Sequence, residues 1–213
     1  MSLAHAERLA LADALDAAGP SAPTLCTGWN ARDLAAHVLL RERRPDAAVG
    51  IVVKPLAGWT ERVQRGYASS SWPALVRQVR TGPPRWSPFG LPGVDDAANL
   101  TEFFVHTEDV RRAQAGWEPR DLDPALADAL WRTLRQRARL FYRHVPVGLV
   151  LRRSDVAEVA GAGITVKPGH GVVVVGPPGE LLLHAFGRGE HARVEKQGDP
   201  ADVAALDSAP LGV

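Results

Sequence analysis

Hydrophobic residues recur every three to four positions up to about residue 143, which is the spacing of amphipathic helices. Asn30, with Asp33 three residues later, has the form of a capping box, and Pro45 should end the helix that this box begins. The pattern predicts helices over residues 3–18, 31–44, 59–68, 72–80, 96–114 and 124–143. Residues 46–58 stay ambiguous, because glycine and proline interrupt their apolar run.

The pattern changes near Pro146 to short β-branched runs separated by glycine. Such runs are typical of strands, and we expect strands at 147–154, 164–168 and 171–176. Residues 192–198 can form a further strand. Two segments that begin with or close to proline predict short helices, over 177–187 and 199–209. We therefore predict an α+β protein with a boundary near 145, in which residues 1–145 form a helical bundle and residues 146–213 a small α/β domain.

Composition narrows the class of protein. Of the 213 residues 46% are hydrophobic and 23% charged, and the formal net charge of +1 gives no bulk attraction to nucleic acid. A single cysteine, Cys26, excludes an intramolecular disulfide and a Cys-based zinc cluster. The N-terminal segment has charges within its apolar pattern, unlike a signal peptide, and no run approaches the length of a membrane span. We expect a soluble cytoplasmic protein, a monomer or homodimer, with neither nucleic-acid nor membrane partners.

Two of the predicted helices carry ionisable side chains where a bundle helix should be apolar. Glu102 and His106 are four residues apart and so share one helix face, and His37 stands among alanine, valine and leucine. Two histidines and one glutamate are a normal ligand set for a zinc-type divalent ion, so we predict a metal site at these three residues. The alternative is a buried His37 bonded to the backbone and a solvated Glu102–His106 pair.

Asp109 follows His106 by three residues, close enough to orient its imidazole or to serve as a fourth ligand. An ion pair with Arg111 or Arg112, or a hydrogen bond to a neighbouring helix, is an equally open interpretation. Asp33 precedes His37 by four residues, and we favour a capping role for it.

The remaining candidates favour structural interpretations. Cys26 is more typical of a small buried side chain than of a nucleophile, and His184 should face the core of the second domain. The histidines expected at the surface or in loops are His5, His144, His170 and His191. The arginines that could bind a substrate carboxylate, although each is more typical of a solvated surface, are Arg111, Arg112, Arg152, Arg153 and Arg188.

Two segments, "LCTGWNARDLAAHVLLRERRPD" and "LTEFFVHTEDVRRAQAGWEPR", resemble the two motifs of the DinB-like metal-binding bundles. The nearest branch is the actinobacterial one named for mycothiol-dependent maleylpyruvate isomerase. The residues that match its W-x-x-x-D-L-x-x-H and E-x-x-x-H motifs are Trp29, Asp33, Leu34 and His37, then Glu102 and His106. The resemblance implies a four-helix bundle that binds a divalent metal, usually zinc, through the two histidines and the glutamate. It covers nearly the whole chain, because "GPPGELLLHAFGR" and "DPADVAAL" look like the sterol-carrier-like α/β domain that often follows such bundles.

The resemblance also implies mycothiol as a cosubstrate. A metal with an open position lowers the pKa of a bound thiol, and addition of the thiolate to a small electrophile would give isomerase or S-transferase chemistry. Our first hypothesis is therefore an enzyme, similar to a sister branch of the isomerase rather than to the isomerase itself. A non-catalytic metal-binding or small-ligand carrier module is the second hypothesis, and a metal-hydroxide hydrolase is the third.

Overall fold

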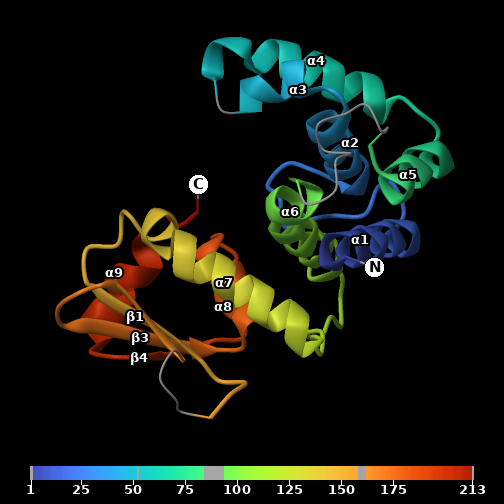
Figure 1. Ribbon diagram of the computed structural model, residues 1–213. Coiled ribbons are helices and arrows are strands. Elements are labelled where there is room, and N and C mark those ends of the chain that lie inside the picture. Colours follow the sequence, from blue (N-terminus) through green and yellow to red (C-terminus); the bar gives the residue numbers. More distant parts are fainter. Residues whose placement is uncertain (1, 52, 84–93, 158–161, 213) are drawn as a thin grey trace. The chain divides into compact units, whose positions relative to one another are not determined.

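The computed structural model describes residues 2–51, 53–83, 94–157 and 162–212 (Figure 1). Helices and one four-stranded sheet make up the regular structure, which agrees with the predicted α+β class. The chain divides into two compact units, Met1–Glu118 and Pro119–Val213, and each is described by itself. None of the described helices is both long and apolar enough to cross a membrane.

The first unit is helical. Its elements are α1 (Leu3–Ala18), α2 (Ala31–Arg43), α3 (Pro45–Ala48), η1 (Val49–Ile51), η2 (Lys54–Leu56), α4 (Ala57–Ala68), α5 (Trp72–Thr81) and α6 (Val94–Arg111). Helix α1 packs against α5 and α6, and helix α2 packs against α4 and α5. The helices predicted for this region are present with small shifts at their ends, and the ambiguous segment after Pro45 contains one short helix and two 3-10 turns.

The start of α2 is set by the predicted capping box. The side chain of Asn30 accepts a hydrogen bond from the Asp33 amide at 3.1 Å, and the Asp33 carboxylate accepts one from the Asn30 amide at 3.2 Å. These bonds satisfy amides that would otherwise lack partners in the first helical turn. Asp33 is therefore a capping residue, as predicted, and its box fixes where the turn that carries His37 begins.

The core of the first unit is aliphatic and is shared by α1, α2, α5 and α6. Its buried members include Leu11, Leu15, Leu34, Leu39, Leu75, Val79 and Phe103. A buried ion pair crosses this core, in which Arg8 donates to Glu42 at 2.8 Å and lies 4.5 Å from the centroid of the Phe103 ring. The pair joins α1 to α2, and the ring contact extends the connection to α6.

The second unit combines helices with the sheet. Its elements are α7 (Pro124–Phe141), β1 (Gly148–Arg153), β2 (Gly163–Lys167), β3 (Gly171–Gly176), α8 (Pro178–Ala185), η4 (Gly189–His191), β4 (Glu195–Gln197) and α9 (Pro200–Ser208). The strand order is β2-β1-β3-β4, with β1 parallel to β3 and the other two pairs antiparallel. A Cβ atom at Gly171 would lie 1.9 Å from the Gly148 carbonyl oxygen, so this close pairing requires glycine. The strands and helices predicted after Pro146 are all present.

The division between the units lies earlier than the predicted boundary near 145. Helix α7 belongs to the second unit, where it packs against α8 and β2. Its buried face includes Leu130, Leu134 and Phe141. The helical unit therefore extends to Glu118 rather than over residues 1–145, because the apolar face of α7 is covered by the α/β unit. Helical periodicity revealed that this face exists but not which partner covers it.

Candidate metal centre

Helix α6 carries titratable side chains in its buried interior. Every residue from 103 to 110 is buried, including His106, Glu108 and Asp109. Glu108 is neutralised by two arginines of the same helix region, since it accepts hydrogen bonds from Arg112 at 2.5 Å and from Arg111 at 2.8 Å. Arg112 is thus a buried partner of Glu108 rather than the solvated side chain that its sequence environment favoured.

His37 of α2 meets Glu102 and His106 of α6, as the sequence predicted. One ligand atom from each of the three side chains lies within 4.8 Å of the other two. The centroids of the two imidazole rings are 5.6 Å apart, and the ring of Trp29 packs 4.8 Å from that of His37. Because ligands of one zinc-type ion lie about 3–4 Å apart, the three groups are close to the arrangement that a shared ion requires.

One ring nitrogen of His106 has the properties of a metal ligand. Its Nε2 atom is buried and forms no hydrogen bond within the described part of the chain, although Glu102 Oε1 lies 3.4 Å away. At this distance a protonated His106 forms an ion pair with Glu102, and a divalent ion between the two groups would take the place of that proton. Two imidazoles and one carboxylate also suit a zinc-type ion chemically. The residues therefore fit a divalent ion bound on the Nε2 side of His106.

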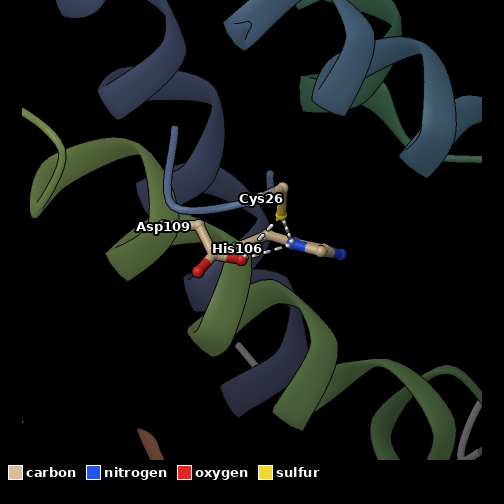
Figure 2. Close-up of side chains that lie close together, drawn as sticks. All are labelled: Cys26, His106 and Asp109. Carbon is tan, nitrogen blue, oxygen red and sulfur yellow. Dashed lines mark hydrogen bonds and ion pairs between the residues drawn. The ribbon is translucent and has the colours of Figure 1, made fainter. Parts of the chain in front are cut away.

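The other ring nitrogen of His106 is held by Asp109 and Cys26. Asp109 Oδ2 lies 3.0 Å from Nδ1, and the Cys26 thiol donates to the same carboxylate oxygen at 3.2 Å. Figure 2 shows the carboxylate and the thiol gathered at this nitrogen, while the second ring nitrogen points away from them. Of the roles predicted for Asp109, this geometry fits the orientation of the imidazole, because the bond to Nδ1 leaves Nε2 as the ring nitrogen that could coordinate an ion.

Cys26 reaches α6 because the loop between α1 and α2 folds onto that helix. The Leu25 amide donates to the Asp109 carbonyl oxygen at 3.0 Å. Within the loop, Thr24 Oγ1 donates to the Trp29 carbonyl oxygen at 2.8 Å. The same loop therefore positions the Cys26 thiol beside Asp109 and the Trp29 ring beside His37. The sequence favoured a small buried side chain for Cys26 and did not reveal this contact.

The electrostatics of the site give each predicted ligand a definite protonation state. Burial, reinforced by His106, lowers the pKa of His37 to about 3. Burial would raise the pKa of Glu102, but His106 and Arg41 outweigh it and lower this pKa to about 2. Burial also favours neutral His106, yet its contacts with Asp109, Cys26 and Glu102 raise its pKa well above 6.5. Without a metal, neutral pH therefore leaves His37 neutral, Glu102 ionised and His106 protonated.

Arg41 lies on the exposed side of the site. Its Nη1 atom is 3.2 Å from Glu102 Oε1, and the two side chains are 22% and 28% exposed, whereas His37 and His106 are buried. Arg41 follows His37 by four residues and so shares its face of α2. The sequence interpretation overlooked this arginine, although the spacing from His37 was a signal that could have found it.

The arginines considered from the sequence are engaged elsewhere. Arg111 and Arg112 pair with Glu108, and the other three belong to the second unit. The contacts of those three are Arg152 with Gln197, Arg153 with Asp128 and Asp155, and Arg188 with the Phe186 carbonyl oxygen. Within the described residues, these contacts place none of the five beside His37, Glu102 or His106.

Two further groups of potential ligands fit a metal less well. Cys26, His106 and Asp109 already satisfy one another through hydrogen bonds. His170 forms the other group with Asp199 and Asp202, but His170 and Asp199 are 78% and 70% exposed. His184, predicted to be structural, is buried with Nδ1 2.8 Å from the Tyr142 hydroxyl. The group of His37, Glu102 and His106 is therefore the candidate metal centre.

In comparisons with known proteins, no family model, curated protein or solved structure matches this chain.

Proposed function

We propose that the first unit binds one divalent, zinc-type ion through His37, Glu102 and His106 and uses it to activate the thiol of a small cosubstrate. The observation that carries this proposal is the buried Nε2 atom of His106, which lacks a hydrogen bond among the described residues and faces Glu102 at 3.4 Å. His37 supplies a second imidazole from another helix, and burial keeps this imidazole neutral by lowering its pKa. Three protein ligands leave a further position open, the feature that separates catalytic from structural zinc sites.

The reaction class follows from that open position. A divalent ion held by the three residues would act as a Lewis acid and lower the pKa of a thiol that coordinates it at the open position. The resemblance of the two motifs to the mycothiol-dependent maleylpyruvate isomerase branch favours mycothiol as the thiol, and isomerase or S-transferase chemistry on a small electrophile. On this proposal the first unit is a DinB-like bundle and the second is a sterol-carrier-like domain.

The residues of the chain have distinct roles in this proposal. His37 and Glu102 hold the ion in the charge states that their surroundings already impose. Asp109 positions His106 through Nδ1, and Cys26 supports Asp109 through its thiol proton. The burial of both imidazoles keeps water away from the ligand atoms and strengthens their electrostatic interactions. Glu102 and Arg41 border the side by which substrates would enter.

A cobalt-substituted protein tests the proposal. Mycothiol should produce a thiolate-to-cobalt charge-transfer absorption, and the same preparation should consume mycothiol when an electrophilic enone is added. Glu102→Ala should lose both signals because it removes a ligand, whereas His170→Ala should keep both because His170 lies in the second unit. Ultraviolet-visible spectroscopy and a thiol assay provide the two readouts.

The outcomes separate the hypotheses. A protein with one bound cobalt per chain but no thiolate absorption would contradict thiol activation. A thiolate absorption without turnover across a panel of enones and chlorinated aromatics would favour the non-catalytic binding module. Absorption that survives in Glu102→Ala would show that the thiol binds cobalt somewhere else.

A further inference from the structure

We propose that Arg41 forms an anion subsite beside the metal, so that the centre selects ligands in which a carboxylate lies close to the coordinating thiol. The inference rests on the proposed function, since it concerns a ligand bound at that metal. Arg41 Nη1 lies 3.2 Å from Glu102 Oε1. This contact places a permanent positive charge next to the only carboxylate of the proposed ligand set.

Exposure shows from which side a ligand must arrive. His37 and His106 are buried, whereas Arg41 and Glu102 are 22% and 28% exposed. A molecule that reaches the centre from solvent therefore passes the guanidinium group. The thiol of Cys26 and the carboxylate of Asp109 lie at the opposite nitrogen of the His106 ring. The Asp109 carboxylate thus lies behind His106, whereas the Arg41 guanidinium and the Glu102 carboxylate lie together on the exposed side.

Metal binding would change what Arg41 can do. Before metal binding, the guanidinium neutralises Glu102. A divalent ion on Glu102 takes over that neutralisation, and the guanidinium, which has five N–H donors, then has donors to offer to an incoming anion. Arginine suits a carboxylate better than lysine does, because its planar fork can donate two parallel hydrogen bonds. The preferred ligand therefore combines a thiol for the metal with a carboxylate for Arg41.

Arg41 differs in this respect from Arg43 at the end of α2 and from Arg44, which follows the helix. Arg43 donates to the carbonyl oxygens of Gln78 and Gly82, which fixes it against α5 and the residue after it. Arg44 pairs with Asp46 through two hydrogen bonds of 2.8 and 2.7 Å. Arg44 is consequently a matched control, since it is a partly exposed arginine three residues further along that is paired with a carboxylate outside the site.

A comparison of two thiols in four proteins tests the subsite. The probes are 3-mercaptopropionate and 3-mercaptopropionamide, which differ in charge, and each is titrated into cobalt-substituted wild type, Arg41→Gln, Arg41→Lys and Arg44→Gln. The thiolate-to-cobalt absorption gives a dissociation constant for each probe. The ratio of the two constants is compared between proteins, so that the intrinsic difference between the thiols cancels. Bound cobalt is measured in every sample.

We expect Arg41→Gln to shift the ratio against the carboxylate by about tenfold, the size of one charge-assisted hydrogen bond. Arg41→Lys should give an intermediate shift, and Arg44→Gln should leave the ratio at the wild-type value. An unchanged ratio in Arg41→Gln would overturn the subsite while leaving thiol activation intact. A loss of cobalt from Arg41→Gln but not from Arg44→Gln would also overturn it, because Arg41 would then be a support for Glu102. No absorption with either thiol in the wild type would instead mean that the proposed function had failed.

Discussion

His106 has a different environment at each of its ring nitrogens. Nδ1 meets the Asp109 carboxylate at 3.0 Å, and Nε2 is buried without a hydrogen bond in the described part of the chain. This asymmetry determines which nitrogen can coordinate an ion and which is fixed by the protein. From it we also predict how many protons are released when a metal binds.

Metal binding should release about one proton per chain at neutral pH. The proton comes from His106, whose pKa is raised well above 6.5, because an ion at Nε2 must displace it. His37 should release none, since its pKa of about 3 already leaves it neutral. Calorimetric titration with zinc, in buffers of different ionisation enthalpy, measures the number of protons released per zinc ion bound. The affinity should accordingly rise by about tenfold per pH unit below the pKa of His106.

Asp109→Asn provides the control for this prediction. Without the carboxylate at Nδ1, the pKa of His106 should fall, so the variant should release clearly less than one proton. Asp46→Asn, which changes an exposed carboxylate outside the site, should behave as the wild type does. Zinc binding without proton release, or with an affinity independent of pH between 6 and 7.5, would contradict the assignment of His106 as a ligand.

The sequence predicted that His37, Glu102 and His106 lie together, because its signal is chemical. Glu102 and His106 occupy one helix face, and His37 stands in an apolar segment, so the residue types and their spacing were enough to infer that they meet. The role of Asp109 could not be chosen, because the spacing of three residues fits orientation and coordination equally. Arg41 was missed because an arginine near the end of a helix is usually solvated, and the contact with Glu102 depends on how α2 and α6 approach each other.

At the scale of elements, the site depends on where α2 begins. The capping box at Asn30 and Asp33 fixes the first turn, and His37 lies in the turns that follow. The loop that precedes the cap carries Cys26 to Asp109 and Trp29 to His37. A weaker cap should therefore destabilise the first unit and loosen these contacts together.

Asn30→Ala should lower the free energy of unfolding of the first unit by about 1 kcal/mol, because it removes the acceptor for the Asp33 amide. Asn30→Ser, which keeps a capping oxygen, should retain most of that stability. Urea unfolding of both variants, followed by circular dichroism and tryptophan fluorescence, measures the difference. Equal stability of Asn30→Ala and the wild type would mean that the cap contributes nothing.

Most elements were predictable because their signals are local. Periodicity, the capping box and the prolines located the helices, and β-branched runs between glycines located the first three strands. The local sequence did not show to which unit α7 belongs, since either the bundle or a sheet could have covered its buried face. That face packs against α8 and β2, which places the helix in the second unit.

At the scale of the whole molecule, the candidate ligands all belong to one unit. His37, Glu102 and His106 lie within Met1–Glu118, and the second unit contributes none of them. The second unit has its own buried polar contact, between Tyr142 and His184, and its own exposed group around His170. The proposed metal chemistry therefore belongs to the helical unit, which should bind one divalent ion.

The metal content of the purified protein tests that claim most directly. After loading with zinc and gel filtration in chelator-free buffer, mass spectrometry should find about one zinc per chain. His37→Ala and His106→Ala should each lose most of this zinc, while His170→Ala, which disrupts the exposed group, should retain it. A wild-type protein without zinc would contradict the account, and so would a His106→Ala variant that keeps as much zinc as the wild type.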